Sequence, residues 1–532
     1  MNNDFFKMNL LSLEKNNPEL CSRLSSVKAG NCYFFLEARS GEIIPALQGS
    51  NGASLPLHST VDPRREGERL VSALAEEGYL VFLGLGGAFA VRAALEREAT
   101  KKILIIEYDC SSLSELLKSK DYTGLFRDKR VRLLIDPSPC EIEAFIVNNY
   151  LPALDGGIHV FPLRVRTDGD NRFSNSADAV RKAIEAVIRD YSVQAYFGKR
   201  WFCNIIRNLF LVQEQNVKIA SVQKAIICAA GPSLEEQLPE IKKYQTTNKK
   251  EQKESILIAT DTSLPVLLQA GIEPKAVISM DCQHISYRHF FNVLPEKTTL
   301  FLDLASPPLI ASRAKQLSFF SGGHPFSLYA AQYWRSLPIL DTSGANVTFA
   351  ALSLAENLGA REISLYGADF SYPRGKTYAR GAYIYPFFEN IQSRYMPLEA
   401  QHSAFLYRDS SIKKICKEKN DWYYETTSFE FYRKKVKEKE KSISGLKHIK
   451  SMEILPESYI YKNAREFLTM YRKSIENIAL FNPSGYNELE TTLLPLAAYI
   501  RKKNPLYGSA ELFNAVKSCC LEELNAVLVN QN

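Results

Sequence analysis

The sequence predicts an α/β protein with two Rossmann-like α/β domains, a small N-terminal β region and a C-terminal helical bundle. Apolar runs that end in glycine or acidic residues recur between residues 79 and 136, and again between 225 and 366. Segments with helical periodicity separate these runs, as expected for parallel strands covered by helices on both faces. After residue 459, apolar residues recur only at helical spacing.

Length and composition limit the possible architectures. A chain of 532 residues is too long for one hydrophobic core, and its 45% hydrophobic content excludes wholesale disorder. The net charge of +7 is small for this length and does not indicate a nucleic-acid partner. We expect four parts: a β-hairpin region at 1–75, a Rossmann-like domain at 76–195, a second α/β domain at 196–395 and a helical domain at 396–532.

The first part of the chain combines a hairpin with a nucleotide-binding type of pattern. Strands are expected at 32–36 and 43–47, and a helix from Pro63. The strand 79–83 leads into Gly84-Leu85-Gly86-Gly87, a helix at 88–98 and a strand at 102–106 that ends in Glu107; another strand follows at 131–135. Because the third glycine of a dinucleotide fingerprint is out of register, we favour a structural role for this loop over a second active site.

A long helix, expected from Ser174 to about Val217, connects the first α/β series to a second one. The strands of the second series are expected at 225–229, 255–259, 276–280, 299–302 and 363–366. After Tyr395 the strand signals fade, and the charged segment 433–441 is expected to be a solvated helix face or a linker.

Polar residues follow three consecutive strands of the second series. Gly231, Pro232 and Ser233 form a strand-to-helix turn that either contacts a nucleotide or is an ordinary βα turn. Each of the next two strands is followed by a cluster of polar residues. The first cluster is Asp261, Thr262 and Ser263, and the second is Asp281 and Gln283. The alternative is that these residues cap the following helices. Since open α/β sheets bind ligands at the carboxyl ends of their strands, we expect a ligand at this edge.

Two further loops carry groups suited to an anion. Ser343 and Gly344 precede a helix expected to be amphipathic, where backbone N–H groups and the helix dipole favour negative charge. The strand after that helix is expected to be buried and is followed by a loop rich in donors to phosphate oxygens, unless it is simply a solvated basic loop. These residues are Asp369, Tyr372, Lys376, Tyr378 and Arg380.

Histidines and cysteines do not form a metal motif, and we expect no metal site. Most of the seven histidines are expected on the surface or in loops, but His284 and His324 could approach a ligand. The ten cysteines are scattered, and Cys228 reads as a reduced core residue. We find neither a signal peptide nor an apolar window of 18 residues, so we expect a cytoplasmic protein without membrane insertion.

Four of these motifs resemble the central domain of the motility accessory factor glycosyltransferases, over most of the first 400 residues. They are Gly231-Pro232-Ser233-Leu234, Thr260-Asp261-Thr262-Ser263, Ser279-Met280-Asp281-Cys282-Gln283 and Tyr366-Gly367-Ala368-Asp369-Phe370. The segment from Leu57 to Pro63, with Glu66, is similar to their N-terminal region. The resemblance implies transfer of a nonulosonic acid, pseudaminic or legionaminic in type, from a CMP-activated donor to serine or threonine of flagellin.

The same domain resembles bacterial sialyltransferases, in which two tyrosines six residues apart hold the donor phosphate. Tyr372 and Tyr378 keep that spacing, whereas Ala229 and Ala230 replace a glycine and an asparagine of the sialyltransferase loop. The resemblance implies that 196–395 is the transferase domain. Within it we take Asp281, His284 and His324 as candidates for the base. We expect a nucleotide site formed by Gly231, Pro232, Ser233, Asp261, Thr262, Ser263, Gln283, Ser343, Gly344, Asp369, Lys376 and Arg380.

Two alternatives remain at the sequence level. The domain also resembles archaeal 6-hydroxymethylpterin diphosphokinase and MptE-like proteins, for which Mg²⁺ could be held by Asp261, Asp281 and Asp369. The second alternative is that the chain is a non-catalytic factor that binds flagellin. In the transferase reading the partners are the CMP-nonulosonate donor and flagellin, with no cofactor and no nucleic acid.

Overall fold

The computed structural model describes residues 3–14, 17–27, 30, 32–48, 54–74, 77–163, 171–212, 221–246, 255–291, 294–418, 421–444, 461–481 and 486–530. The chain forms two compact units. The N-terminal unit comprises 1–196, 480–487 and 497–513, and the central unit comprises 197–479, 488–496 and 514–532. Two short C-terminal segments, 480–487 and 497–513, thus belong to the N-terminal unit.

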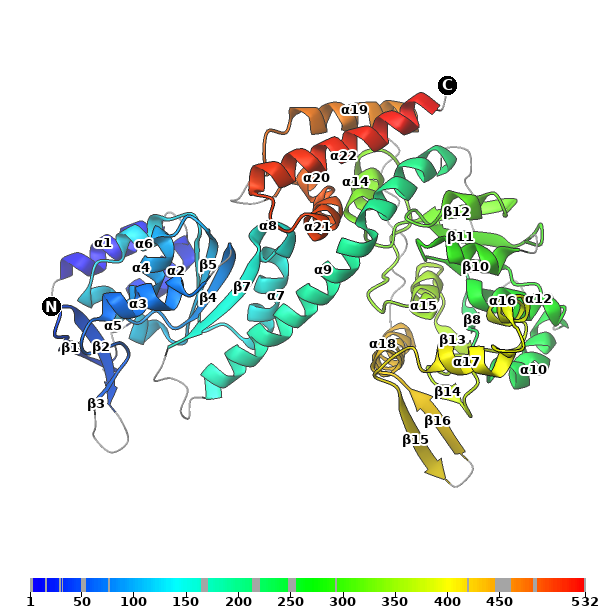
Figure 1. Cartoon of the computed structure of the whole chain (residues 1–532), viewed down its shortest axis with the longest axis horizontal. Helices are drawn as coiled ribbons and strands as arrows, with labels where there is room; N and C mark the ends of the chain where they lie inside the picture. The colour runs from blue at the N-terminus through cyan, green and yellow to red at the C-terminus, as the bar shows by residue number, and fades with distance from the viewer. Residues whose placement is uncertain are drawn as a thin grey trace. The chain divides into compact units, whose positions relative to one another are not determined.

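The N-terminal unit is built around a four-stranded parallel sheet of order β6-β5-β4-β7 and a small antiparallel sheet of order β1-β2-β3 (Figure 1). Its strands are β1 (Tyr33–Glu37), β2 (Ile43–Gln48), β3 (Ser54–Pro56), β4 (Gly78–Leu83), β5 (Thr100–Glu107), β6 (Val131–Ile135) and β7 (Gly157–Pro162). Its helices are α1 (Asn3–Glu14), α2 (Pro18–Ser26), α3 (Pro63–Ser72), α4 (Phe89–Glu96), α5 (Cys110–Ser119), α6 (Thr123–Arg127), α7 (Pro139–Asn149), α8 (Pro152–Asp155) and the first part of α9 (Asn171–Val212).

The predicted hairpin and βαβ unit are present. Tyr33 pairs with Leu47 across the hairpin, and β3 adds a strand that the sequence analysis did not predict. The helix α3 begins at Pro63, with the Asp62 side chain accepting a hydrogen bond from the Arg65 amide, and the core strand β4 is buried along its whole length. The edge strand β7 was also missed; its partly exposed side chains interrupt the apolar run that marks a central strand.

The central unit contains a six-stranded, wholly parallel sheet of order β12-β11-β10-β9-β8-β13 (Figure 1). The strands are β8 (Lys224–Cys228), β9 (Ser255–Thr260), β10 (Ala276–Ser279), β11 (Thr299–Asp303), β12 (Gln316–Phe320) and β13 (Glu362–Tyr366). Between them lie α10 (Leu234–Thr246), η1 (Asp261–Ser263), α12 (Leu264–Gln269), η2 (His284–Phe290), α13 (Pro308–Ala311), α14 (Pro325–Tyr333) and α15 (Val347–Asn357). Five of the strands were predicted; β12, at one edge, was not.

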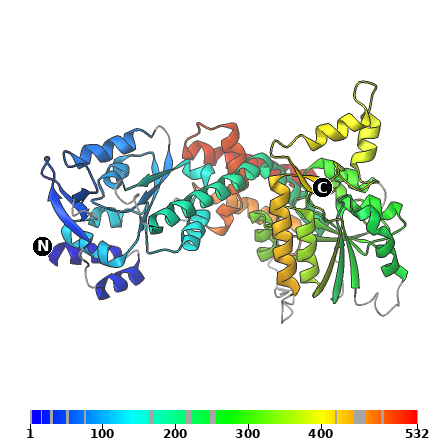
Figure 2. The same ribbon diagram turned by 90° about the horizontal axis from the view of Figure 1, so that it is seen from below.

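The helix α15 differs from its predicted amphipathic form, because every residue from Thr348 to Ala355 is buried. One side packs on the sheet, and α18 (Thr427–Ser444) runs alongside another, as the ribbons of Figure 2 show. Val436 and Ile443 of α18 are buried in the same hydrophobic core as α15. The charged segment 433–441 is therefore a helix with a buried apolar side. The strand β13, expected to be buried, is an edge strand whose first four residues are partly or fully exposed.

The region 396–532, expected to be helical, contains a strand pair. β15 (Lys413–Glu418) and β16 (Asp421–Glu425) form an antiparallel hairpin, and β14 (Tyr372–Pro373) pairs with β16. Three lysines and one glutamate in β15 mask the apolar signal that would have predicted it. The remaining helices are α16 (Ile384–Ile391), α17 (Leu398–Leu406), α19 (Ala464–Asn477), α20 (Glu488–Thr491), α21 (Leu494–Lys503) and α22 (Ser509–Asn530).

All ten cysteines are described and none forms a disulfide. Cys228 is fully buried in β8, as predicted, and burial raises the pKa of its thiol to about 12. In the part of the chain that the structure describes, no helix combines the length and apolarity needed to cross a bilayer.

Candidate functional site

The carboxyl ends of the six parallel strands place the predicted polar residues in a row. β9 and β10 lead into Asp261 and Asp281, and β8 and β13 lead into the Gly231 and Asp369 turns. β11 ends in Asp303, a residue that was not predicted. Strands β8 to β12 follow one another outward along the sheet, while β13 lies on the other side of β8. The strand order therefore reverses between β8 and β13, which is where open α/β sheets form a crevice for ligands.

The turns after β8 and β13 are fastened to each other. The Ser233 amide and hydroxyl both donate to Asp369 Oδ2, each at a distance of 3.0 Å. The Gly231 amide donates to the Gly367 carbonyl at 2.8 Å. A Cβ on Gly231 would lie 2.1 Å from Asp369 Oδ2, so no larger residue fits without movement. The turn is more than an ordinary βα connection, yet these donors are already occupied by Asp369 and by the Gly367 carbonyl.

The loop from Tyr372 to Gly381 lies against this fastened pair of turns. The Ala379 amide donates to the Ala230 carbonyl over 2.9 Å. Glu235, in the first turn of α10, accepts from the Arg380 amide over 2.9 Å and pairs with Lys376 Nζ at 3.9 Å. The structure thus gathers Gly231, Pro232, Ser233, Asp369, Lys376 and Arg380 in one region.

The ends of β9 and β10 bring two carboxylates and an imidazole together. Asp261 is buried; it accepts from the Thr262 amide (2.7 Å) and hydroxyl (3.0 Å), and from the Ser279 hydroxyl (2.8 Å). Asp281 accepts from the Gln283 amide over 2.9 Å. Burial raises the pKa of Asp281, and the nearby Asp261 charge raises it further.

The imidazole of this group belongs to His289 in η2. Burial lowers the pKa of His289, while the charges of Asp261 and Asp281 oppose that change. Its ring stacks edge-on against Tyr383 with centroids 4.6 Å apart, and its buried Nδ1 has no hydrogen-bond partner among the described residues. A neutral imidazole with an unused nitrogen beside two carboxylates can accept a proton.

The phenols of Tyr378 and Tyr383 lie close enough to Asp261 to feel its charge. Tyr378 and Tyr383 have ring centroids 6.3 Å apart. Burial raises the pKa of both phenols, and the Asp261 charge adds to the effect. Tyr372, which is buried in β14, lies close enough to Tyr378 to influence its pKa, and the Arg408 guanidinium lowers the pKa of all three phenols. These phenols are neutral donors near neutral pH.

Ser263 and His284 do not belong to this group of side chains. The Ser263 hydroxyl is fully buried and donates to the Cys228 and Thr260 carbonyls, which makes it a link between β8 and β9. His284, at the start of η2, is exposed.

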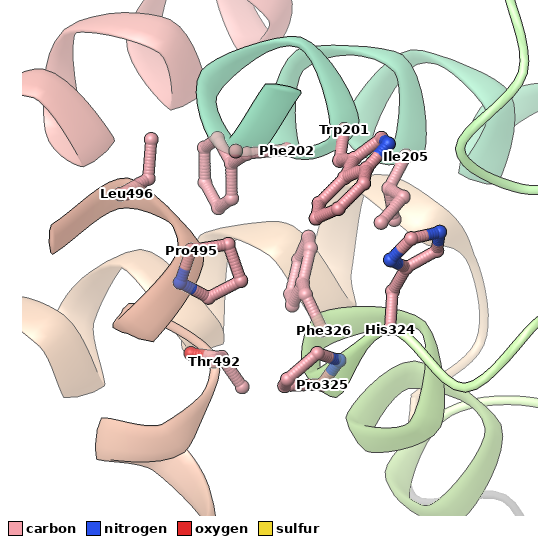
Figure 3. A pocket seen from close by; sticks show the side chains of 10 residues that line it. Trp201, Phe202, Ile205, His324, Pro325, Phe326, Thr492, Pro495 and Leu496 are labelled. Atoms are coloured by element: carbon pink, nitrogen blue, oxygen red, sulfur yellow. The ribbon is translucent and has the colours of Figure 1, made fainter. Parts of the chain in front are cut away.

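His324 lies beside the buried Asp303, with Nε2 3.9 Å from Oδ1, and packs on Trp201 at 4.5 Å between centroids. Figure 3 shows both rings at a cavity lined by residues of α9, α14 and the α20–α21 segment. Its volume of about 10 Å³ is close to the space that one water needs, so a sugar does not fit there.

Ser343 and Gly344 adopt a turn before α15, but the cap of that helix is Asn346. Its side chain accepts from the Phe349 amide over 2.9 Å, and the Ser343 amide donates to Asp341 over 3.0 Å. Ser343 is exposed, whereas Gly344 is buried so tightly that a Cβ would lie 2.2 Å from the Phe349 ring. The helix N-terminus is thus partly satisfied by the chain itself.

Two buried asparagines of α9 hold the loops behind this edge. Asn204 Nδ2 donates to the Ala305 carbonyl (2.7 Å) and the Cys282 carbonyl (3.4 Å). Asn208 Nδ2 donates to the carbonyls of Leu304 and Ser306, each over 2.8 Å. The connecting helix therefore fixes the segments that follow β10 and β11.

The comparisons agree with this architecture. Residues 203–375 match the family model described as 6-hydroxymethylpterin diphosphokinase MptE-like. This part of the chain therefore resembles an MptE-like domain. That domain extends from α9 through β13 to Gly375, and includes the turns, carboxylates and His289 described above.

A solved structure shares the fold over nearly the whole chain. The MAf glycosyltransferase from Magnetospirillum magneticum AMB-1 superimposes with a TM-score of 0.61, covering 99% of this chain and 96% of that chain at 13% sequence identity. The expected resemblance is confirmed in the MptE-like domain and in the fold.

Two uncharacterized proteins of Treponema pallidum (strain Nichols) are similar over shorter stretches. One is 40% identical over 124 residues, which is 23% of this chain and 44% of that protein. The other is 28% identical over 179 residues, which is 33% of this chain and 82% of that protein. The chain thus aligns with less than half of the first relative's length.

Sequence reasoning missed several residues near the carboxyl edge of the central parallel sheet. His289 and Tyr383 contact each other from separate segments, and Arg408 follows α17. The sequence analysis assigned no role to His289, which is partly buried; its position eight residues after Asp281 was the available signal. Within the described ranges, no group of three or more histidine, cysteine, aspartate or glutamate side chains is arranged to hold a metal ion.

Proposed function

We propose that this chain is a glycosyltransferase that moves a nonulosonic acid, pseudaminic or legionaminic in type, from a CMP-activated donor to serine or threonine hydroxyls of flagellin. The observation that carries the proposal is the group of Asp261, Asp281, His289, Tyr378 and Tyr383 at the carboxyl edge of the MptE-like sheet. The shared fold with a glycosyltransferase supports it. The ten free thiols fit the proposed cytoplasmic location.

Such a transfer has two chemical demands. The bond between the sugar and CMP must break with negative charge developing on the phosphate, and the acceptor hydroxyl must lose its proton. Neutral phenols are good donors to a phosphate oxygen, and a neutral imidazole is a good acceptor of a hydroxyl proton. The edge combines both types of group.

We assign the base to His289, supported by Asp281, in place of His284 and His324. The lowered pKa of His289 keeps the imidazole neutral near pH 7, and its buried Nδ1 has no partner among the described residues. A hydroxyl bound at Nδ1 would transfer its proton there, and the two carboxylates would stabilise the resulting imidazolium. His284 is exposed, and His324 adjoins a cavity too small for a sugar.

We assign the departing phosphate to Tyr372 and Tyr378, helped by Lys376 or Arg380. The remaining predicted nucleotide contacts, including Gly231, Ser233, Ser343 and Gly344, stay proposals for the base and ribose. Because Ser233 already donates twice to Asp369, it can reach a nucleotide only if that carboxylate moves. No cofactor is needed in this mechanism, since donors and cations suffice to hold a leaving monophosphate.

The test measures release of CMP from CMP-pseudaminic acid in the presence of flagellin. The His289→Asn variant should lose about 10²–10⁴-fold in turnover, the range that general base catalysis contributes. The His284→Asn variant, altered in the same segment, should keep its activity. Equal losses in the two variants would contradict the assignment of the base.

A second candidate, pyrophosphate transfer from ATP to 6-hydroxymethylpterin, is favoured by the description of the matching family model. In that reading Asp261, Asp281 and Asp369 would face magnesium. Magnesium-dependent release of AMP from ATP in the presence of the pterin alcohol, without CMP release from the nonulosonate donor, would select it. Binding of flagellin without either activity would indicate a non-catalytic factor.

A further inference from the structure

The N-terminal unit contains a cavity of about 640 Å³ that belongs to neither proposed reaction. It is lined by the end of β4 (Phe82, Gly84 and Leu85) and by the end of β7 and the residues after it (Phe161, Pro162 and Leu163). The strands β4, β5 and β6 follow one another to one side, and β7 lies on the other side of β4. The cavity thus occupies the point where the strand order reverses, with a volume typical of small-molecule sites.

The glycine-rich turn beside this cavity is already occupied by the chain itself. The Gly87 amide donates to His58 Nε2 over 2.8 Å, and the Leu85 amide donates to Glu107 Oε1. Gly86 has a φ of +52°, and a Cβ on it would lie 2.5 Å from His58 Nε2. A dinucleotide phosphate therefore has no room on this turn, in agreement with the structural role favoured from the sequence.

Aromatic rings form one wall of the cavity. Phe82 and Phe161 stack with centroids 5.1 Å apart, and His58 packs edge-on against Phe89 at 5.0 Å. Burial lowers the pKa of His58 to about 4, so this imidazole is neutral at physiological pH. Such a wall suits a flat ring more than a sugar, because stacked rings bury apolar faces.

The rim of the cavity carries positive charge without an internal partner. Arg65 and Arg69 lie one helical turn apart on α3, are exposed, and make no ion pair with any described residue. The neighbouring carboxylates are engaged: Asp62 accepts from the Arg65 amide over 3.0 Å, and Glu66 accepts from the Ser59 amide over 2.8 Å. The two guanidinium groups are therefore the cations at the mouth that form no ion pair with a described carboxylate.

We propose that this cavity binds a small ligand made of a flat aromatic or heteroaromatic ring and one phosphate or carboxylate. The ring lies against Phe82 and Phe161, and the anion lies at Arg65 and Arg69 rather than on the glycine turn. The site is independent of the proposed transfer, because it lies within the N-terminal unit.

The experiment uses the full chain and four probes. AMP and 4-hydroxybenzoate combine a ring with a phosphate or a carboxylate, whereas adenosine and inorganic phosphate supply only one half each. Calorimetry gives the affinities, and hydrogen exchange maps the bound region. We expect AMP or 4-hydroxybenzoate, or both, to slow hydrogen exchange at residues 82–91. Adenosine and inorganic phosphate should each bind at least tenfold more weakly than the ring anion that does so. Which ring anion binds identifies the anionic group.

Three variants locate the site. Arg65→Gln/Arg69→Gln should weaken binding of that probe about tenfold or more, and Ala73→Trp, at an exposed lining position, should block it. Arg23→Gln/Arg127→Gln removes the same charge from exposed positions outside the lining and should change nothing. Circular dichroism checks that each variant is folded.

The proposal is overturned if neither ring anion slows exchange at 82–91, or if protection is confined to the MptE-like edge around 228–233. It is also overturned if the Arg65→Gln/Arg69→Gln variant binds the ring anion with the affinity of the parent protein. A third contrary result is that 4-hydroxybenzoate does not bind and adenosine binds as tightly as AMP. None of these outcomes depends on whether the chain transfers a sugar.

Discussion

His289 and His58 are two imidazoles whose pKa burial lowers, with different consequences. His289 lies beside two carboxylates and keeps one buried nitrogen unused, which suits proton transfer. His58 accepts a hydrogen bond from the Gly87 amide, which suits a structural role. The surroundings of each ring, rather than its type, separate the two roles.

Transfer should lose rate on the acid side as His289 takes up a proton, with the midpoint below pH 6.5 because burial lowers its pKa. In Asp281→Asn the midpoint should move to still lower pH, since the Asp281 charge raises the pKa of His289. The measurement is the pH dependence of kcat/KM for both proteins. A midpoint that moves to higher pH in the variant would contradict the assigned base.

Stability of the N-terminal unit should depend on pH through His58. Its folded-state pKa of about 4 lies below the unfolded value of 6.5, so the unfolded chain binds the proton first as pH falls. The free energy of unfolding should drop by about 3 kcal/mol between pH 6.5 and 4 on this account. Hydrogen exchange of β4 and β5 amides measures it.

The His58→Gln variant should flatten that dependence. His159→Gln, at a partly exposed position on β7 of the same unit, is the matched control and should keep it. The same loss of stability in wild type and His58→Gln would assign the effect to other groups.

The phenol pair gives a third test at the residue scale. Changing Tyr372 and Tyr378 together to Phe removes two donors, and removing a donor of this type costs about 2.7–4 kcal/mol of transition-state stabilisation. Turnover should therefore fall at least about a hundredfold. Tyr407→Phe, which removes an exposed hydroxyl that donates to Tyr424, is the control. Unaltered turnover in the double variant would exclude the pair from the mechanism.

At the scale of elements, the joined turns after β8 and β13 set the geometry of the MptE-like edge. Gly231→Ala would drive a methyl group into Asp369 and the Gly367 carbonyl, at 2.1 and 2.5 Å. Overpacking of this kind costs about 1–3 kcal/mol. Chemical denaturation should show that loss together with reduced nucleotide binding. Gly124→Ala, where the added Cβ meets nothing within 4 Å, should be neutral or stabilising.

The elements also show where sequence patterns suffice. Central strands such as β4 and β9 were predicted because they are continuous apolar runs. The strands β7 and β12 lie at sheet edges and were missed. α15 was predicted to be amphipathic because one of its sides was expected to face solvent. That side is buried by α18, which comes from a segment whose charges predict a solvated helix face or a linker. Asp261 and Asp281 were predicted because each follows a strand. His289, Tyr383 and Arg408 reach the same edge only through tertiary packing, which local spacing does not encode.

At the scale of the whole molecule, the two parallel sheets use their switch points differently. In the MptE-like domain, the edge next to the β8–β13 reversal carries carboxylates, phenols and an imidazole, the groups on which the proposed transfer depends. In the N-terminal unit, the β4–β7 reversal opens into a cavity with an aromatic wall and a positive rim. One architecture thus supports a proposed reaction site and a proposed ligand site in the same chain.

The central claim is that the MptE-like edge binds a cytidine nucleotide, and a thermal-shift comparison of CMP with ATP and magnesium tests it most directly. CMP at 100 times its dissociation constant should stabilise the fold by about 2.7 kcal/mol, and the Tyr372→Phe/Tyr378→Phe variant should show a smaller shift. Stabilisation by ATP with magnesium but not by CMP would contradict the claim.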